Sequence, residues 1–108
     1  MLRLGATRQV QPDRREAPRD EVYHRTRITL ADGRSASVQL VNVSATGFMI
    51  RSEEELGPDT PFKIKLPRLG DRPAESRWSL AGRVGCQFGQ PIGLADYLEL
   101  LGTLVREG

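Results

Sequence analysis

Residues 22–30 alternate between two kinds of side chain, and this alternation constrains the fold more than any other feature of the chain. A period of two is typical of a half-buried β-strand. Asp32-Gly33 follows directly and is a strong hairpin signal. The segment therefore predicts the first arm of a β-hairpin. One predicted face carries Val22, His24, Thr26, Ile28 and Leu30, and the other carries Tyr23, Arg25, Arg27 and Thr29.

Five further segments have the length and pattern of short strands. Residues 44–47 are predicted to form the turn between the second and third strands, because Ser, Thr and Gly favour turns. The predicted strands run over residues 36–43, from residue 48 to about 50, and over residues 62–66, 77–81 and 84–88.

The remaining segments are predicted to be loops, apart from one helix near the end of the chain. Residues 52–55 could form one helical turn, but Gly57-Pro58 behind them favours a solvated acidic loop. Residues 67–75 contain two prolines, a glycine and four charged residues, so we expect a loop there as well. Apolar residues recur at helical spacing from Leu94 to Val105, which predicts a helix packed on the strands first and a dimer surface second.

This succession of short strands predicts an all-β fold, a small antiparallel barrel with a C-terminal helix laid against it. With 108 residues the chain fits one domain. We expect a flexible arm over residues 1–12 and the folded domain over residues 13–108. The start of the chain lacks the apolar run of a signal peptide, and no stretch is long enough to span a bilayer. With a single cysteine, these features predict a cytoplasmic domain without membrane insertion.

The residue types needed for catalysis or metal binding are scarce. The chain has one histidine, His24, and one cysteine, Cys86, which cannot build a typical zinc site. We expect His24 to be packed in the core and Cys86 to be a buried structural thiol. The sequence therefore predicts no enzyme, no metal site and no cofactor.

Two short clusters carry the residues that could bind a ligand. Residues 14–19 are rich in arginine, whose planar fork matches phosphates and guanine edges. Residues 42–47 form a small polar turn that ends in glycine, which allows a flat ligand to approach closely. Either cluster alone has an ordinary explanation, a solvated basic tail or a common hairpin turn. The candidate ligand-binding residues are Arg14, Arg15, Arg19, Asn42, Ser44 and Gly47.

In this order, the two clusters resemble the PilZ domain family. The resemblance rests on Arg15-x-x-x-Arg19 with Arg14 before it, on Asn42-x-Ser44-x-x-Gly47, and on the strand pair between them. It covers roughly residues 13–105. It implies a six-stranded antiparallel β-barrel that binds the bacterial second messenger cyclic di-GMP.

The resemblance also implies a role for each matching residue. Arg15 and Arg19 would contact phosphate and the Hoogsteen edge of guanine. Arg14 would help to decide whether one ligand or an intercalated pair binds. In the second motif, Asn42 would bind a guanine edge, Ser44 would direct its hydroxyl at the ligand, and Gly47 would permit a tight turn. Trp78 is not expected in the site, because such a residue is more often part of the core or the barrel rim.

The sequence leaves three functions in competition. The leading one is a cyclic di-GMP receptor that changes conformation on binding and signals to an unidentified downstream protein, as a monomer or weak homodimer. A PilZ-fold protein-interaction domain without the nucleotide is the second. The third, a small-barrel binder of single-stranded nucleic acid, needs aromatic platforms and a basic groove. Phe48, Phe62 and Phe88 are expected in strand cores, and the net charge is only +2, which argues against long nucleic acid.

Overall fold

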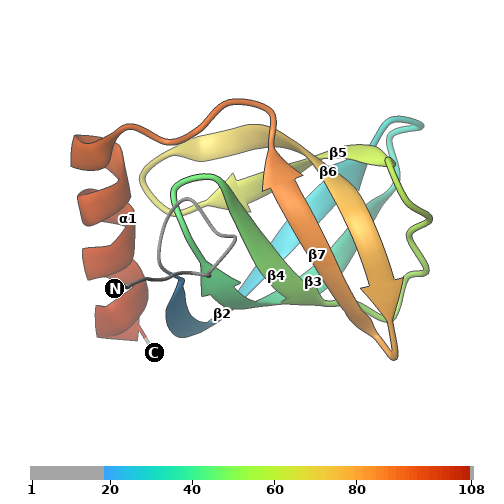
Figure 1. Ribbon diagram of the computed structural model, residues 1–108, viewed down its shortest axis with the longest axis horizontal. Helices are drawn as coiled ribbons and strands as arrows, with labels where there is room; N and C mark the ends of the chain where they lie inside the picture. Colours follow the sequence, from blue (N-terminus) through green and yellow to red (C-terminus); the bar gives the residue numbers. More distant parts are fainter. Residues whose placement is uncertain (1–18, 108) are drawn as a thin grey trace, which may run out of the picture.

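Six antiparallel strands close into a barrel, and one helix lies against it (Figure 1). The computed structural model describes residues 19–107. The elements are β2 (Asp20–Leu30), β3 (Ser35–Val43), β4 (Gly47–Arg51), β5 (Pro61–Leu66), β6 (Gly70–Leu80), β7 (Arg83–Phe88) and α1 (Leu94–Glu107).

The strands follow the order β2-β3-β4-β7-β6-β5, and the pairing of β2 with β5 closes the ring. The all-β fold, the six-stranded antiparallel barrel and the C-terminal helix predicted from the sequence are thereby confirmed. The predicted alternation in β2 is also observed, since Ile28 and Leu30 are buried while Tyr23 is 67% exposed. His24 on this strand is half-buried rather than enclosed in the core.

The barrel interior is aliphatic with a small aromatic group at its centre. Phe48 meets Phe62 edge to face, with ring centroids 6.2 Å apart, and lies 4.8 Å from Phe88. Such contacts add to the burial of apolar area that holds a small barrel together. The core thus takes up all three phenylalanines of the chain.

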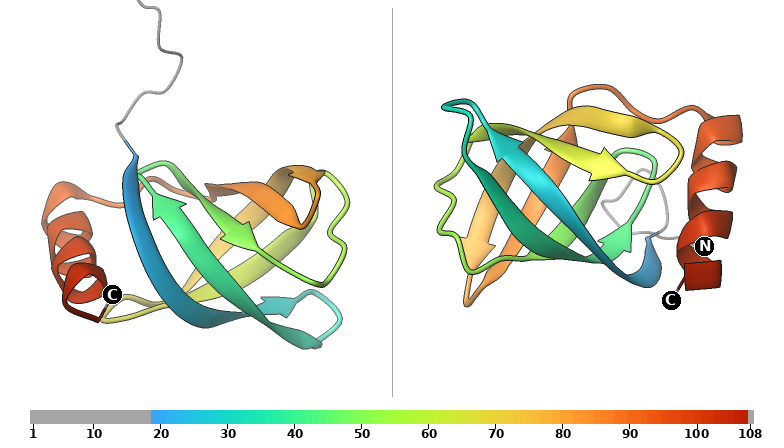
Figure 2. Two further views of the ribbon diagram at one scale, coloured as in Figure 1. Left: turned by 90° about the horizontal axis from the view of Figure 1, so that it is seen from below. Right: turned by 180° about the vertical axis from the view of Figure 1, so that it is seen from behind.

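Helix α1 lies beside one end of the barrel, next to the start of β2 (Figures 1 and 2). Leu100 and Leu104 are fully buried, and Tyr97 packs against the core from the edge. The predicted apolar stripe therefore divides into two faces, because Leu94 and Val105 stay exposed. No helix within residues 19–107 is both long and apolar enough to cross a membrane.

The predicted loop over residues 67–75 is wrong, because β6 already begins at Gly70. Proline usually argues against a strand, since it cannot donate to the ladder. The Pro73 carbonyl, however, accepts from the Gly89 N–H at 2.9 Å, just beyond the end of β7. The backbone nitrogen of Pro73 faces the same side, so its missing N–H interrupts no bond to β5. The strand predicted over residues 77–81 ends at Leu80, because Ala81 and Gly82 form the turn before β7, which begins at Arg83.

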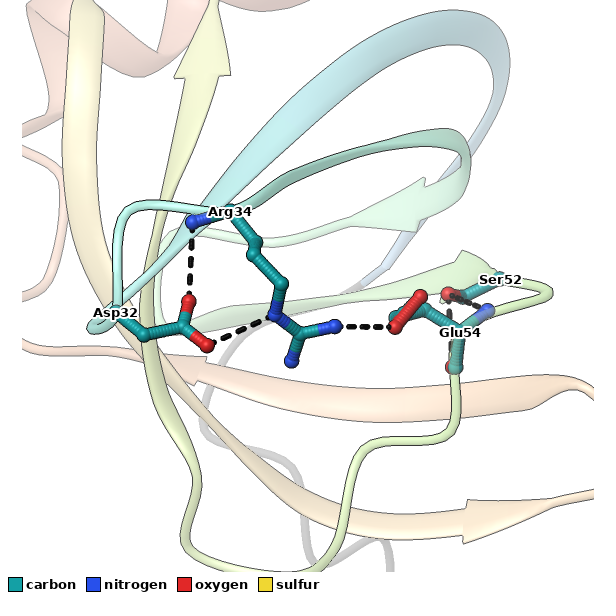
Figure 3. Close-up of polar contacts among 4 residues, drawn as sticks. All are labelled: Asp32, Arg34, Ser52 and Glu54. Carbon is teal, nitrogen blue, oxygen red and sulfur yellow. Dashed lines mark hydrogen bonds and ion pairs between the residues drawn. The ribbon is translucent and has the colours of Figure 1, made fainter.

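A salt-bridged cluster joins the β2–β3 hairpin to the loop after β4 (Figure 3). Arg34 donates to Asp32 at 2.8 Å and to Glu54 at 3.0 Å. Hydrogen bonds from the backbone N–H and the side chain of Arg34 lower the pKa of Asp32 below its ordinary value. Ser52 accepts from the Glu54 N–H, which confirms that residues 52–55 form a loop and not a helical turn.

Candidate functional site

The turn between β3 and β4 is built around the hydroxyl of Ser44. This oxygen accepts from the backbone N–H groups of Thr46 at 3.3 Å and Gly47 at 3.2 Å. The Ser44 N–H donates to the Gly47 carbonyl at 2.8 Å. Short polar side chains often shape turns in this way. Ser44 is 3% exposed. Its hydroxyl fixes the turn, and the residue also borders a hollow on the surface.

Gly47 is required by a close approach between two strands. A Cβ atom at this position would lie 2.5 Å from the carbonyl oxygen of Cys86 on β7. Gly47 pairs with Gln87 and the next residue, Phe48, pairs with Cys86, so the contact belongs to the β4–β7 ladder. The glycine therefore allows the Ser44–Gly47 turn to sit tightly on β7.

A bulge in β6 turns Trp78 onto this same region. The register between β6 and β7 shifts between Ser76 and Trp78. Bulges redirect side chains and are frequent beside functional sites. The indole of Trp78 covers Gly85, where a Cβ atom would lie only 2.3 Å from the ring. Trp78 is 44% exposed, so one side of it remains open to solvent.

Arg19, the turn and Trp78 border one open hollow of about 380 Å³. Arg19 immediately precedes β2 and is exposed. Arg77 also borders the hollow, but its guanidinium is 2.8 Å from Glu75 and 3.4 Å from Asp59. The described lining contains no carboxylate and no histidine; it consists of Arg19, Ser44, Thr46, Gly47, Arg77, Trp78, Gly85, Cys86, Gln87, Phe88, Gly89 and Pro91. A hollow with this lining suits an anion that has a flat surface.

Asn42 lies on the adjoining part of the outer barrel surface. It is paired with Glu21 on one side and Met49 on the other, and Met49 is paired with Gly85 beneath Trp78. The side-chain nitrogen of Asn42 is 4.0 Å from the Met49 sulfur. Its Oδ1 is buried, and it is the one such side-chain atom in residues 19–107 that lacks a hydrogen-bond partner. Asn42 is thus one strand away from the hollow, and its Oδ1 remains able to accept a hydrogen bond.

The structure brings together four of the six residues predicted for the site, three of them on one hollow and Asn42 beside it. Arg14 and Arg15 lie outside the described residues. Trp78, which the sequence pattern does not place in the site, forms a wall of the hollow. The signal that could have found it is the pair Trp78 and Gly85, because a bare glycine opposite an exposed indole permits flat packing.

The described side chains offer little chemistry beyond binding. Burial raises the pKa of the Cys86 thiol to about 12, so the reactive thiolate is disfavoured. The prediction of a buried cysteine is confirmed. His24 does not border the hollow. Within residues 19–107, no group of three His, Cys, Asp or Glu side chains could hold a metal ion.

The closed barrel with an arginine-bordered hollow at one strand turn is a small β-domain with a candidate binding site. The sequence model of the PilZ domain matches residues 13–107, and the chain therefore belongs to the PilZ domain family. Among solved structures, the chain is similar to the PilZ domain with c-di-GMP of YcgR from Escherichia coli. The TM-score is 0.59 at 16% identity, over 88% of this chain and 94% of that one. This similarity concerns the fold. A comparison with curated proteins found no match.

Proposed function

We propose that this PilZ domain is a receptor for cyclic di-GMP that binds the ligand in the hollow between Arg19 and Trp78. One observation carries the proposal. Arg19 and the Ser44–Gly47 turn belong to separate motifs, yet both border the same hollow. Family membership and the YcgR domain, whose structure contains c-di-GMP, support the choice of ligand.

The lining suits each part of such a ligand. The guanidinium of Arg19 can form charge-assisted bonds to a phosphate or to the Hoogsteen edge of guanine. The open face of Trp78 offers a plane on which a purine can stack. The unpartnered Oδ1 of Asn42 can accept from a guanine N–H at the edge of the site. In this proposal Arg15 adds a second fork, and Arg14 influences whether one or two ligands bind.

Titration of the full chain tests this function. We expect cyclic di-GMP to bind with a measurable heat and GTP, which has no second guanine, to bind far more weakly. The same samples should be followed by NMR, because a heat near zero alone is ambiguous. If cyclic di-GMP shifts no amides around residues 44–47 and 85–89, the proposal is wrong and the interaction-domain alternative takes its place.

A hydrogen-bonded tyrosine connects helix α1 to residues beside the proposed ligand site. The hydroxyl of Tyr97 on α1 lies 2.6 Å from Asp20 Oδ2 and 3.0 Å from the Val43 carbonyl oxygen, and its single proton is shared between these two acceptors. Asp20 follows Arg19 and Val43 precedes Ser44, so one side chain contacts the neighbours of both motifs. Burial and the Asp20 carboxylate raise the pKa of Tyr97 well above its ordinary value, which keeps the phenol protonated as a donor. We infer that ligand binding, by repositioning Arg19, signals to a partner protein through α1.

Tyr97→Phe should uncouple the helix from the site. The ring is retained, so we expect the fold to persist with a loss of stability of about 1 kcal/mol, typical of one hydrogen bond. Cyclic di-GMP should shift the amides of α1 in the wild type and leave them nearly unchanged in the variant. Tyr23→Phe is the matched control, because Tyr23 is 67% exposed on β2. Equal shifts of α1 in wild type and Tyr97→Phe would rule out this path.

A further inference from the structure

A row of outward-facing cations crosses four strands of the barrel. The register pairs Arg25 with Gln39, Gln39 with Arg51, and Arg51 with Arg83. Directly paired residues of neighbouring strands face the same side of a sheet. Arg25, Arg51 and Arg83 are all exposed, so they and Gln39 form one row on the outer surface of β2, β3, β4 and β7. We call these four residues the basic row.

The arginines of the basic row differ from four other arginines within residues 19–107 in having no acidic partner among the described residues. Four arginines elsewhere on the described surface form ion pairs: Arg34, Arg68, Arg72 and Arg77. Asp32 and Glu54, in the segments that follow β2 and β4, are both engaged by Arg34 (Figure 3). Glu53 is the acid that borders the same hollow as Arg25 and Arg51. Glu53 is one carboxylate beside a row of three guanidinium groups, so the row keeps an excess of positive charge.

The arrangement also places two like charges opposite each other. Arg51 and Arg83 are direct cross-strand partners, with Cα atoms about 5 Å apart in such pairs. Like charges in this position repel and reduce stability. A ligand that brings carboxylates to the row would relieve this repulsion, because each guanidinium can donate two parallel hydrogen bonds to one carboxylate.

A hollow of about 420 Å³ accompanies the row and gives a ligand somewhere to sit. Ser37 and Ser52 border it beside Arg25, Gln39 and Arg51. Glu53 is the one acid on its described lining, and no aromatic residue borders it. Single-stranded nucleic acid binds on aromatic platforms, so this lining favours a protein ligand.

The row lies close to the cyclic di-GMP site that we propose. Arg51 and Arg83 are each two positions along their strands from Met49 and Gly85, which is about 7 Å. Gly85 lies beneath the indole of Trp78, and its strand partner Met49 lies on the same outer surface. A partner seated on the row would therefore lie next to the hollow.

We propose that the basic row is the docking surface for an acidic segment of a partner protein. The carboxylates of such a segment pair with Arg51 and Arg83, whose spacing matches side chains one turn apart on a helix, about 5–6 Å. Arg25 extends the contact across two more strands, with Gln39 between them as a neutral hydrogen-bonding group. The proposal does not depend on nucleotide binding and is tested without the nucleotide.

The test uses the full chain labelled for NMR and a deca-glutamate peptide, at an ionic strength of about 0.15 M where weak long-range attraction is screened. We expect shifts concentrated on β4, β7 and the loop after β4. The double variant Arg51→Gln/Arg83→Gln should bind the peptide roughly tenfold more weakly, as the loss of two exposed ion pairs implies. Arg83→Lys, which keeps the charge, should retain most of the affinity and guards against a folding defect.

The matched control is Arg68→Gln/Arg72→Gln, which removes the same charge from the part of the surface that faces α1. The proposal predicts that this control changes peptide affinity by less than twofold. Equal losses in the two double variants would show a response to net charge alone and would overturn it. Tighter binding of an oligothymidylate than of the peptide at the same residues would also overturn it, in favour of nucleic acid.

Discussion

Arg19→Ala is expected to weaken cyclic di-GMP binding on the order of 30-fold. A charge-assisted hydrogen bond to a phosphate contributes about 2 kcal/mol, and the same free energy corresponds to this change in Kd. Arg19 is exposed, and no ion pair ties it to the described surface, so its removal should leave the melting temperature unchanged. Titration calorimetry of wild type and variant measures the effect.

Arg27→Ala is the control for this experiment. Arg27 is also an exposed arginine near the start of the chain, but it faces the β2–β3 hairpin and donates to Ser35 at 2.7 Å. The Arg27→Ala variant should bind cyclic di-GMP with an affinity within twofold of the wild type. If both variants bind cyclic di-GMP as the wild type does, Arg19 does not contact the ligand and the site must be sought elsewhere.

Gly47→Ala is expected to destabilise the fold by about 2–3 kcal/mol, the usual cost of forcing an atom into packed structure. The new Cβ would lie 2.5 Å from a backbone oxygen, and a backbone group cannot swing aside as a flexible side chain can. Strands β4 and β7 must separate locally for the methyl group to fit. Urea denaturation of wild type and variant measures the difference.

Gly102→Ala adds the same methyl group but is expected to change the stability in the opposite direction. Gly102 lies within α1, and nothing stands within 4 Å of a Cβ added there. Alanine is the better helix former by about 1 kcal/mol, so this variant should gain stability. If the Gly47→Ala protein is as stable as the wild type, strands β4 and β7 have room for the added methyl group. Gly47 would then be needed for close approach of the ligand and not for the fold.

Alternation of side chains was sufficient to predict most of the barrel. The pattern over residues 22–30 and the Asp32-Gly33 turn specify a hairpin because a strand buries alternate residues and the turn fixes the register. The start of β6 is not predictable from its composition, because two prolines, a glycine and four charged residues over residues 67–75 indicate a loop. The nitrogen of Pro73 faces Gly89, just beyond the end of β7, and not β5, and this location depends on the neighbouring strand and not on the local sequence.

Only part of the candidate site was predictable, because strand pairing and not local sequence brings some of its residues together. Ser44 and Gly47 are close in sequence and form one turn, so their proximity is local information. Trp78 reaches the hollow only because a bulge shifts the register of β6, and Asn42 lies one strand to the side after a similar shift in β3 between Leu40 and Asn42. A bulge depends on how two strands meet, which the spacing within one strand does not reveal.

The pairing of β2 with β5 limits how another protein can recognise this domain. A sheet with a free margin can recruit a foreign strand through main-chain hydrogen bonds, which are nearly indifferent to sequence. Within residues 19–107 every strand already has two neighbours, so this part of the chain offers no free margin for that mode of association. Recognition must then be read from outward side chains, and a few surface substitutions should be able to redirect the domain to a different partner while the sheet itself stays the same.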